Sequence, residues 1–484
     1  MDKRGTMMQT EISTTFIIFG GSGDLAHRKL YPALFNLYKR GFIKEHFAVI
    51  GTARRPWSHE YFQNIVTEAI EESTNDTTGV TEFASHFYYQ SHDVTDTEHY
   101  KALNQLSDQL EEKYQTHGNR IFYMAMSPRF FGTIATHIHD EHILGRGFNR
   151  LIIEKPFGNN LESATVLNKQ INASFDEEDV YRIDHYLGKE MIQDILPLRF
   201  SNPIMKAIWN ADNIASIQIT LAEQLGVEAR GGYYETAGAL RDMVQNHIFQ
   251  IATVLAMPEP KNLTAHEIHE SKQAVLNSLV EPDAAELAHD FVRGQYAGDE
   301  DTLAYVAENQ VSPDSSTETF IAGKIKFGVG PLAGVPIYIR TGKRMAVKQS
   351  VVNIIFKNTT NLYDDASQNV LTLEIDPTNT ISLVLNGKRV AHAGLKEQRL
   401  IYEYEEHIKD DVPDAYERLI GDALVADCTN FTNWHELKSS WQYIDRIEQF
   451  WAQAGKKGLH QYPPFCMGPK EANQIFESAT DKWI

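Results

Sequence analysis

Cationic and phenolic side chains gather in one short stretch of the sequence. The stretch RIDHYLGKE, at Arg182–Glu190, carries His185, Tyr186 and Lys189 beside a helix-like run. These three side chains can converge on one side of the start of that helix, with Lys189 in its first turn. Two cations and a phenol beside helix N–H groups suit a bound phosphate dianion. The alternative is a basic turn that the neighbouring carboxylates neutralise.

A glycine-rich turn follows the first strand-like run. The residues FGGSGDLAHRKL, at Phe19–Leu30, come directly after that run and open a helical stretch. Gly20 and Gly23 allow the backbone to approach a phosphate, and the N–H groups at the helix start point toward it. In a doubly wound fold, the pyrophosphate of a dinucleotide lies at this turn. The spacing GxxG differs from the usual GxGxxG, so an ordinary strand-to-helix turn remains the alternative.

Two arginines stand where NAD-binding folds usually carry an acid. The chain reads GTARRP after the second strand-like run, which gives Arg54 and Arg55. An acid at that position would accept hydrogen bonds from the ribose 2′-hydroxyl. Two guanidinium groups instead suit a 2′-phosphate. Unless both are surface arginines at the start of a loop, the pair favours NADP.

A histidine lies within a long helical pattern. The run AGALRDMVQNHIFQIATVLAM, at Ala237–Met257, predicts one amphipathic helix with Leu240, Val244 and Ile248 in its apolar stripe. His247 falls on that stripe, and a lone histidine there is more often a core residue than a catalyst. No HExxH or other metal-ligand spacing accompanies it, so we expect no metal.

The first part of the chain alternates between strand-like and helix-like patterns. TTFIIFG, FAVIGTAR and RLIIEKPFG are strand-like, and helical stretches such as YPALFNLYKRG lie between them. This alternation is typical of βαβ units in a parallel, doubly wound sheet. Lys155, at the end of the last of these strands, is therefore expected at the carboxyl edge of the sheet, where ligands bind.

The pattern changes after about residue 186. Strand-like runs with short, turn-rich gaps follow, among them IASIQITLAEQL, TFIAGKIKF, VPIYIRTGK, SVVNIIFK, NVLTLEID and TISLVLNGK. Their alternation of polar and apolar residues indicates antiparallel strands. We predict an α/β, Rossmann-like doubly wound domain over residues 1–185. An α+β domain with a large, mainly antiparallel sheet should follow over residues 186–484.

Charge and cysteine content exclude several classes of protein. The 65 acidic residues outnumber 45 lysines and arginines, and a net charge of −20 makes the chain a poor general binder of nucleic acid or anionic membrane. Cys428 and Cys466 form neither a disulfide framework nor a CxxC metal motif, which indicates a reducing compartment. No apolar run has the length of a membrane span or of a signal-peptide core. We expect a cytoplasmic protein without nucleic-acid or membrane partners.

Several motifs together, in their order, resemble one enzyme family. GGSGDLAHRKLYPALFNLYK, IIEKPFG, RIDHYLGKE, DMVQNH and YIRTGKR resemble glucose-6-phosphate dehydrogenase, and most closely its bacterial, lactic-acid-bacterial branch. The resemblance covers essentially the whole chain, and RIDHYLGKE is highly specific to the family. It implies a Rossmann domain, a β+α domain and a homodimer formed through the second sheet. It also implies oxidation of D-glucose 6-phosphate to 6-phosphoglucono-1,5-lactone with hydride transfer to NADP, the first oxidative step of the pentose phosphate pathway.

The resemblance also assigns roles to residues. His247 matches the general base that takes the proton from the C1 hydroxyl, and Asp184 matches the carboxylate that orients it. The residues that match the sugar-phosphate site are His185, Tyr186 and Lys189. Those that match sugar contacts are Lys155, Glu223, Asp242, Lys343 and Lys348. The residues that match the coenzyme site are Gly20, Gly21, Ser22, Gly23, Asp24, Leu25, Arg54, Arg55 and Lys155.

The sequence departs from part of the family after GTA. Some members that use both coenzymes have one arginine and then a neutral polar residue there, whereas Arg55 adds a second cation here. We therefore expect NADP, with NAD as a weaker substitute. One alternative is a sugar dehydrogenase of the glucose–fructose oxidoreductase type, which would not need the phosphate cluster. Another is a non-catalytic NADP-binding sensor, which would not need Asp184 and His247.

Overall fold

The described chain folds into two compact units. The computed structural model describes residues 11–358, 362–403, 413–478 and 481–484. One unit comprises Met1–Gly188 and Pro413–Trp434, and the other comprises Lys189–Val412 and His435–Ile484. None of the helices within the described residues is both long enough and apolar enough to cross a membrane.

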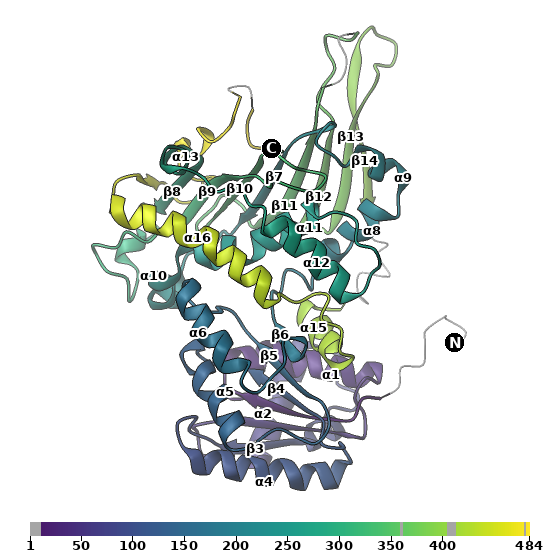
Figure 1. Ribbon diagram of the computed structural model, residues 1–484, viewed down its shortest axis with the longest axis vertical. Coiled ribbons are helices and arrows are strands. Elements are labelled where there is room, and N and C mark those ends of the chain that lie inside the picture. Colours follow the sequence, from purple (N-terminus) through teal and green to yellow (C-terminus); the bar gives the residue numbers. More distant parts are fainter. Residues whose placement is uncertain (1–10, 359–361, 404–412, 479–480) are drawn as a thin grey trace. The chain divides into compact units, whose positions relative to one another are not determined.

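The first unit contains a six-stranded parallel sheet (Figure 1). In spatial order its strands are β3 (Phe87–Ser91), β2 (Phe47–Ala53), β1 (Thr14–Phe19), β4 (Arg120–Met124), β5 (Asn149–Ile153) and β6 (Val180–Arg182). The strand order reverses between β1 and β4, and ligands of doubly wound folds bind at the carboxyl ends of strands at such a point. The predicted α/β class of this half is confirmed.

Helices cover both faces of this sheet. One face packs against α1 (Tyr31–Arg40), α2 (His59–Ser73), α3 (Val80–Ser85) and α15 (Ala415–Leu424). The other face packs against α4 (Thr97–Tyr114); α5 (Phe131–Asp140) lies beside α4, and α6 (Leu161–Ile171) lies beside α5. Burial on both faces explains why the strands read as continuous apolar runs rather than as alternating patterns.

The helix α15 belongs to the first unit although it is distant in sequence. The buried guanidinium of Arg150 donates hydrogen bonds to the carbonyl oxygens of Ala423 (3.0 Å) and Leu424 (2.7 Å) at the end of this helix. The carboxylate of Glu417, on the same helix, lies 2.6 Å from the guanidinium of Arg40 on α1. Charged groups therefore fix a helix that returns from the far end of the chain.

The second unit contains a nine-stranded sheet. In spatial order its strands are β14 (Leu395–Glu403), β13 (Thr380–Lys388), β12 (Val370–Asp376), β11 (Gln349–Phe356), β7 (Ile214–Ala222), β10 (Ile337–Gly342), β9 (Phe320–Ile325), β8 (Phe291–Tyr296) and β15 (Leu459–Tyr462). Neighbours are antiparallel except for the pairs β7–β10 and β8–β15. The predicted large, mainly antiparallel sheet is thus confirmed.

The long helix predicted over residues 237–257 is divided into several segments. The helix α10 (Gly231–Ala239) is interrupted at Gly238, whose φ is +64°, and a π-helical segment η5 (Leu240–Ile248) continues into α11 (Phe249–Ala256). The predicted polar face is also wrong. Asp242 is buried together with the apolar residues of η5, because the segment is enclosed on all sides.

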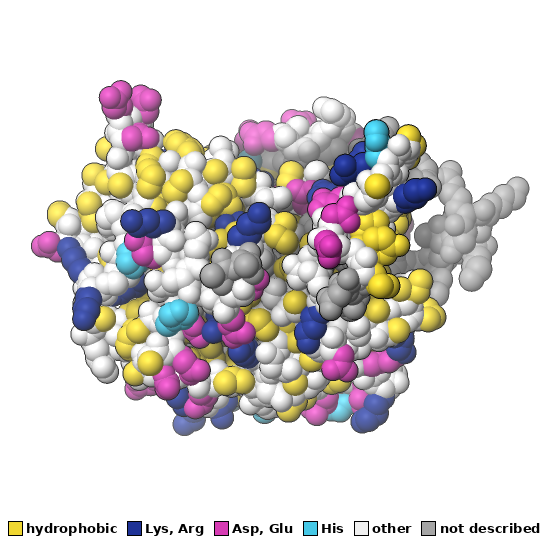
Figure 2. All heavy atoms as spheres, turned by 90° about the horizontal axis from the view of Figure 1, so that it is seen from above, with side chains coloured by type: hydrophobic (Ala, Val, Ile, Leu, Met, Phe, Trp, Pro, Cys, Tyr) yellow, Lys and Arg dark blue, Asp and Glu magenta, His cyan; other side chains and the backbone are white. Residues whose placement is uncertain are grey.

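The surface is mixed rather than basic. On the face shown in Figure 2, Lys and Arg side chains lie scattered among acidic, hydrophobic and other side chains. This distribution accords with a net charge of −20. An anionic ligand must therefore be bound by a local cluster of cations rather than by the field of the whole molecule.

Candidate active site

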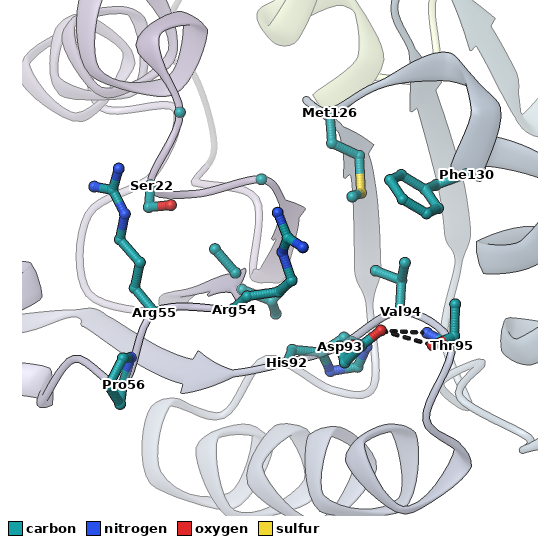
Figure 3. A pocket seen from close by; sticks show the side chains of 14 residues that line it. Ser22, Arg54, Arg55, Pro56, His92, Asp93, Val94, Thr95, Met126 and Phe130 are labelled. Atoms are coloured by element: carbon teal, nitrogen blue, oxygen red, sulfur yellow. Dashed lines mark hydrogen bonds between the residues drawn. The ribbon is translucent and has the colours of Figure 1, made fainter.

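A cavity of about 890 Å³ opens at the carboxyl edge of the parallel sheet, where the strand order reverses (Figure 3). Its lining residues come from the end of β2 and from the segments that follow β1, β2, β3 and β4: Gly20, Ser22, Gly23, Thr52, Ala53, Arg54, Arg55, Pro56, His92, Asp93, Val94, Thr95, Met126 and Phe130. The cavity has the volume of a small-molecule or cofactor site. Of the predicted coenzyme residues, Gly21, Asp24, Leu25 and Lys155 are not part of this lining.

The turn after β1 is closed too tightly for any residue but glycine at position 20. Gly20 has a φ of +100°, and a Cβ there would lie 2.3 Å from the carbonyl oxygen of Ala125. The N–H groups of Gly20 and Gly21 both donate to the carbonyl oxygen of Thr52, at 2.9 and 3.0 Å. A helix then runs from Asp24 to Arg40, with its start directed toward the cavity edge of the sheet. This turn fits the pyrophosphate of a dinucleotide.

Gly21 has a packing role in this turn. A Cβ on Gly21 would lie 2.8 Å from the Cα atom of Gly51 on β2. The hydroxyl of the buried Tyr31 donates to the carbonyl oxygen of Gly21. The residue therefore allows the turn to approach the neighbouring strand.

Two exposed arginines stand at one side of the cavity. In Figure 3 the side chains of Arg54 and Arg55 extend from the end of β2 toward the level of Ser22. The guanidinium of Arg55 lies 5.4 Å from the centre of the Trp57 ring. No carboxylate follows β2 directly, so the usual acceptor for a ribose 2′-hydroxyl is missing from this position.

A carboxylate does line the cavity from the next strand. Asp93 follows β3 and accepts hydrogen bonds from the backbone N–H and the hydroxyl of Thr95, at 3.0 and 2.8 Å. These hydrogen bonds, and to a lesser extent the charge of Arg54, hold the pKa of Asp93 below its usual range. The residues after β3 and β4 were not predicted to line the site. The parallel order β3-β2-β1-β4 brings them to the same edge as the residues after β1 and β2.

Lys155 and Asp184 follow neighbouring strands of the same sheet. The strands β5 and β6 pair in parallel, with Ile153 opposite Arg182, so the residues after them lie at one edge. Asp184 is 1% exposed and accepts a hydrogen bond from the backbone N–H of Tyr186 at 3.0 Å. The peptide bond after Lys155 is cis.

A buried glutamate adjoins Lys155. Glu154 accepts a hydrogen bond of 2.7 Å from the hydroxyl of Tyr123, and Tyr416 of α15 also hydrogen-bonds to it. Burial raises the pKa of Glu154 from 4.5 to about 7, against the opposing effects of these hydrogen bonds and of Lys155. The carboxyl group can therefore exchange a proton near neutral pH, which is a property common in active sites.

Three of the predicted sugar-site residues meet in the second unit. The parallel strands β7 and β10 end side by side, with Ala222 opposite Gly342, and Glu223 and Lys343 follow them. The Lys343 ammonium donates to Oε2 of Glu223 at 2.5 Å and lies 3.8 Å from Oδ2 of Asp242 in η5. Lys343 thus joins two carboxylates that are distant in sequence.

Two tyrosines of α10 complete this cluster. The Tyr233 hydroxyl donates to Oδ1 of Asp242 at 3.3 Å, and the Lys343 ammonium lies 5.3 Å from the centre of the Tyr234 ring. Burial, reinforced by the charge of Asp242, raises the pKa of both phenols above their usual value. Both are therefore neutral hydrogen-bond donors at neutral pH. Neither tyrosine was predicted as a site residue, although the repeated tyrosine of GGYYETAGA precedes Asp242 by only a few residues.

Two further lysines flank one aspartate at the same sheet edge. Asp376 ends β12, and its Oδ2 lies 3.5 Å from the Lys348 ammonium and 3.9 Å from the Lys189 ammonium. Lys189 precedes the short helix α7 (Glu190–Gln193) as its N-cap, so its predicted place in the first turn was wrong by one residue. Asp376 was also missed, because an acid within a strand gives no local sign of a cationic partner.

His247 lies deep in the second unit. It is 0% exposed, and its backbone N–H donates to Oδ1 of Asn246 at 2.6 Å. The same segment η5 carries Asp242, so one helix positions the candidate base and one side of the lysine cluster. π-Helical turns of this kind occur frequently at functional sites.

Both halves of the chain match models of one protein family. Residues 17–194 match the NAD binding domain of glucose-6-phosphate dehydrogenase, and residues 196–484 match its C-terminal domain. The chain is 49% identical to the glucose-6-phosphate 1-dehydrogenase of Streptococcus pneumoniae, over 96% of this chain and 95% of that one. It is 43% identical to the Leuconostoc mesenteroides enzyme of the same name, over 99% of each chain.

A solved structure shows the same architecture. A glucose-6-phosphate dehydrogenase in complex with its substrate glucose-6-phosphate superposes with a TM-score of 0.88 and 30% identity, covering 98% of this chain and 100% of that one. The yeast transcriptional regulator Gal80p superposes with a TM-score of 0.54 at 10% identity, a likeness of fold alone. The family models and the identity over nearly the full length agree with the resemblance seen in the sequence motifs. The chain belongs to the glucose-6-phosphate dehydrogenase family.

Proposed function

We propose that this chain oxidises D-glucose 6-phosphate to 6-phosphoglucono-1,5-lactone with NADP as the hydride acceptor, in the first oxidative step of the pentose phosphate pathway. The observation that carries the proposal is the cluster of Glu223, Asp242 and Lys343 on the strand ends and helix of the second unit. In a chain that belongs to this family, these residues match its sugar contacts. A coenzyme cavity with two arginines in the other unit supplies the second requirement.

His247 acts as the general base in this proposal. It takes the proton from the C1 hydroxyl, and Asp184 fixes its tautomer and stabilises the imidazolium that forms. The burial of both side chains supports these roles, because an enclosed base and its carboxylate are shielded from competing water. When bound, NADP supplies the nicotinamide ring that accepts the hydride from C1.

The cations locate the phosphate end of the sugar. We assign the phosphate to His185, Tyr186 and Lys189, and the sugar hydroxyls to the residues around Lys343, together with Lys155 and Lys348. The carboxylates of Glu223 and Asp242 accept hydrogen bonds from hydroxyl groups, whereas the ammonium of Lys343 donates them. Charge-assisted contacts of this kind fix orientation, so that C1 can face both the base and the coenzyme.

NADP rather than NAD is the coenzyme that the cavity favours. The turn at Gly20 accommodates a pyrophosphate, and Arg54 and Arg55 stand where a 2′-phosphate would lie. Both arginines are exposed, so NAD would leave them solvated at little cost. We therefore propose NAD as a weaker substitute. Residues 1–185 would form the coenzyme domain and residues 186–484 the sugar-binding and dimerisation domain, except that Pro413–Trp434 returns to the first unit.

A homodimer formed through the nine-stranded sheet completes the proposal. The edge strand β14 exposes Leu400 (58%), Ile401 (58%) and Tyr402 (55%) in succession. An edge strand that exposes several large apolar side chains in succession is uncommon in monomers, because such an edge invites pairing with another chain. A second copy that covers this strand accords with the dimer that the family resemblance implies. Cys428 and Cys466 form no disulfide in the described part of the chain, which accords with a cytoplasmic location.

An absorbance assay tests the proposed activity. The purified chain is mixed with glucose 6-phosphate or with free glucose, and with NADP or NAD, and absorbance at the NADPH band is followed. The expected result is rapid reduction with glucose 6-phosphate and NADP, and slower reduction with NAD. Higher activity on free glucose would favour a dehydrogenase of the glucose–fructose oxidoreductase type. Coenzyme binding without any reduction would favour a sensor.

A further inference from the structure

A buried glutamate from a distant segment holds the start of the helix that carries Asp242. Glu318 precedes β9, and its Oε1 accepts a hydrogen bond of 2.9 Å from the backbone N–H of Leu240. Its carbonyl oxygen accepts a second hydrogen bond, of 3.0 Å, from the N–H of Ala239. Gly238 has a φ of +64°, and a Cβ on it would lie 2.4 Å from Oε1 of Glu318. The chain therefore bends at Gly238 around this carboxylate before η5 begins.

The next residue along holds the other side of the sugar cluster. The carbonyl oxygen of Thr319 accepts a hydrogen bond of 2.8 Å from the backbone N–H of Lys343. The hydroxyl of Tyr462 donates to the carbonyl oxygen of Lys343 at 2.7 Å. Glu318 thus holds the backbone at the start of η5, and the next residue, Thr319, holds the backbone of Lys343. The Lys343 ammonium lies 3.8 Å from the carboxylate of Asp242 in η5. A shift of the helix start would change the separation of these two side chains.

We propose that the ionised carboxylate of Glu318 is a positioning residue, which holds the start of η5 and so sets Asp242 against Lys343 for the sugar. The proposal rests on the function proposed above, since it assigns these two residues to the sugar. Glu318 itself is 6% exposed and acts through the N–H of Leu240 rather than through the substrate. A negative charge at a helix start stabilises the exposed N–H groups there more strongly than a neutral acceptor does.

The charge of Glu318 depends on pH near neutrality. Burial, and then the charge of Glu448, raises the pKa of Glu318 to about 7, against the hydrogen bond from Leu240 and the charge of Arg241. Arg241 itself pairs with Glu448 of the helix α16 (Trp434–Ala454) at 2.8 Å. The charged or titratable groups that face Glu318 from the elements around it are Arg241, Glu448, Arg293, Tyr234 and Tyr305. The carboxylate form, and with it the firm helix start, predominates above about pH 7.

Two substitutions of Glu318 separate the hydrogen bond from the charge. Glu318→Ala removes the acceptor of the Leu240 N–H, and we expect KM for glucose 6-phosphate to rise by about tenfold or more, which corresponds to about 1.4 kcal/mol. KM for NADP should not change, because the coenzyme cavity lies in the other unit. The matched control is Glu417→Ala. This buried glutamate of α15 contacts Arg40 and Asn36 in the first unit, so its loss should leave KM for glucose 6-phosphate unchanged.

Glu318→Gln keeps an acceptor oxygen and removes the charge. The ratio of its kcat/KM to that of the wild type is measured at each pH, which cancels the titration of the substrate and of the groups that both proteins share. The ratio should be close to one near about pH 6 and should fall several-fold by about pH 8, where the wild type is ionised. If Glu318→Ala does not fold, this ratio alone decides the question.

Two results would overturn the proposal. One is an unchanged KM for glucose 6-phosphate in a folded Glu318→Ala variant, and the other is a kcat/KM ratio for Glu318→Gln that stays at one across the pH range. A wild-type protein that reduces neither coenzyme with glucose 6-phosphate would instead contradict the proposed function. The two failures are thus distinguishable.

Discussion

Replacement of both arginines after β2 tests the coenzyme assignment most directly. Arg54 and Arg55 line the cavity and are exposed, so each contact with a 2′-phosphate should contribute at the low end of charge-assisted hydrogen bonds, about 1.5 kcal/mol. Together they should contribute about 3 kcal/mol, which corresponds to about 10²-fold in affinity. We expect Arg54→Ala with Arg55→Ala to weaken NADP binding by this factor and to leave NAD binding nearly unchanged, because only NADP carries the phosphate.

The assay measures KM for each coenzyme at saturating glucose 6-phosphate, together with equilibrium binding of each coenzyme. The single variants should each lose about tenfold for NADP. A matched control is Arg28→Ala, which removes an exposed arginine of the same unit. Arg28 pairs with Asp24 at 3.5 Å and does not line the cavity. Equal losses for NADP and NAD in the double variant would refute the reasoning, since the arginines would then hold the loop rather than the phosphate.

Three further substitutions test the catalytic and electrostatic roles. His247→Asn should lower kcat by at least about 10²-fold, which is the scale of general-base loss, while equilibrium binding of glucose 6-phosphate persists. A kcat within a few-fold of the wild type would mean that His247 is only a core residue. Lys343→Met should raise KM for glucose 6-phosphate strongly and leave KM for NADP unchanged, because it leaves Glu223 and Asp242 without their shared cation. Burial raises the pKa of Glu154 from 4.5 to about 7, so the folded state binds the proton more tightly than the unfolded state does. As the pH rises between those two values, this group therefore lowers the free energy of unfolding, by about 3 kcal/mol in all. The stability of Glu154→Gln relative to the wild type should therefore be greater at about pH 8 than at about pH 5. Denaturant unfolding of both proteins at these two pH values measures the difference, and no gain would contradict the burial argument.

Strand ends were the most predictable part of the site. The runs that became β1 and β2 are apolar, short and followed by a turn, so the glycines and arginines after them could be placed at one sheet edge from sequence alone. The structure brings Gly20, Ser22, Gly23, Arg54 and Arg55 to one cavity. Local periodicity sufficed here because each feature depends only on its own strand and on the order of neighbouring strands.

The helix around His247 was only partly predictable. Its apolar periodicity correctly marked a buried face. The chain bends at Gly238 beside Glu318, however, and Asp242 is buried near Lys343, and both of these partners are distant in sequence. The same limit applies to Asp376, whose lysine partners precede other elements. Contacts between distant segments leave no periodic pattern in either segment, so they emerge only when the fold is known.

The mixed character of the second sheet is what assembles the sugar cluster. In a purely antiparallel sheet, neighbouring strands end at opposite edges, and residues after β7 and after β10 would lie at the two ends of the sheet. Because β7 and β10 are parallel, Glu223 and Lys343 follow them at the same edge. The antiparallel strand β11 begins at that edge, after Lys348, and β12 ends there with Asp376.

The strands β12, β11, β7 and β10 are neighbours in the sheet, and only the pair β7–β10 among them is parallel. Because of that one parallel pair, Lys343 lies at the same sheet edge as Glu223, Lys348 and Asp376. Sequence alternation indicated strands but could not reveal this one change of direction. The position of Lys343 beside Glu223 consequently follows from topology, and η5 then supplies Asp242 from outside the sheet.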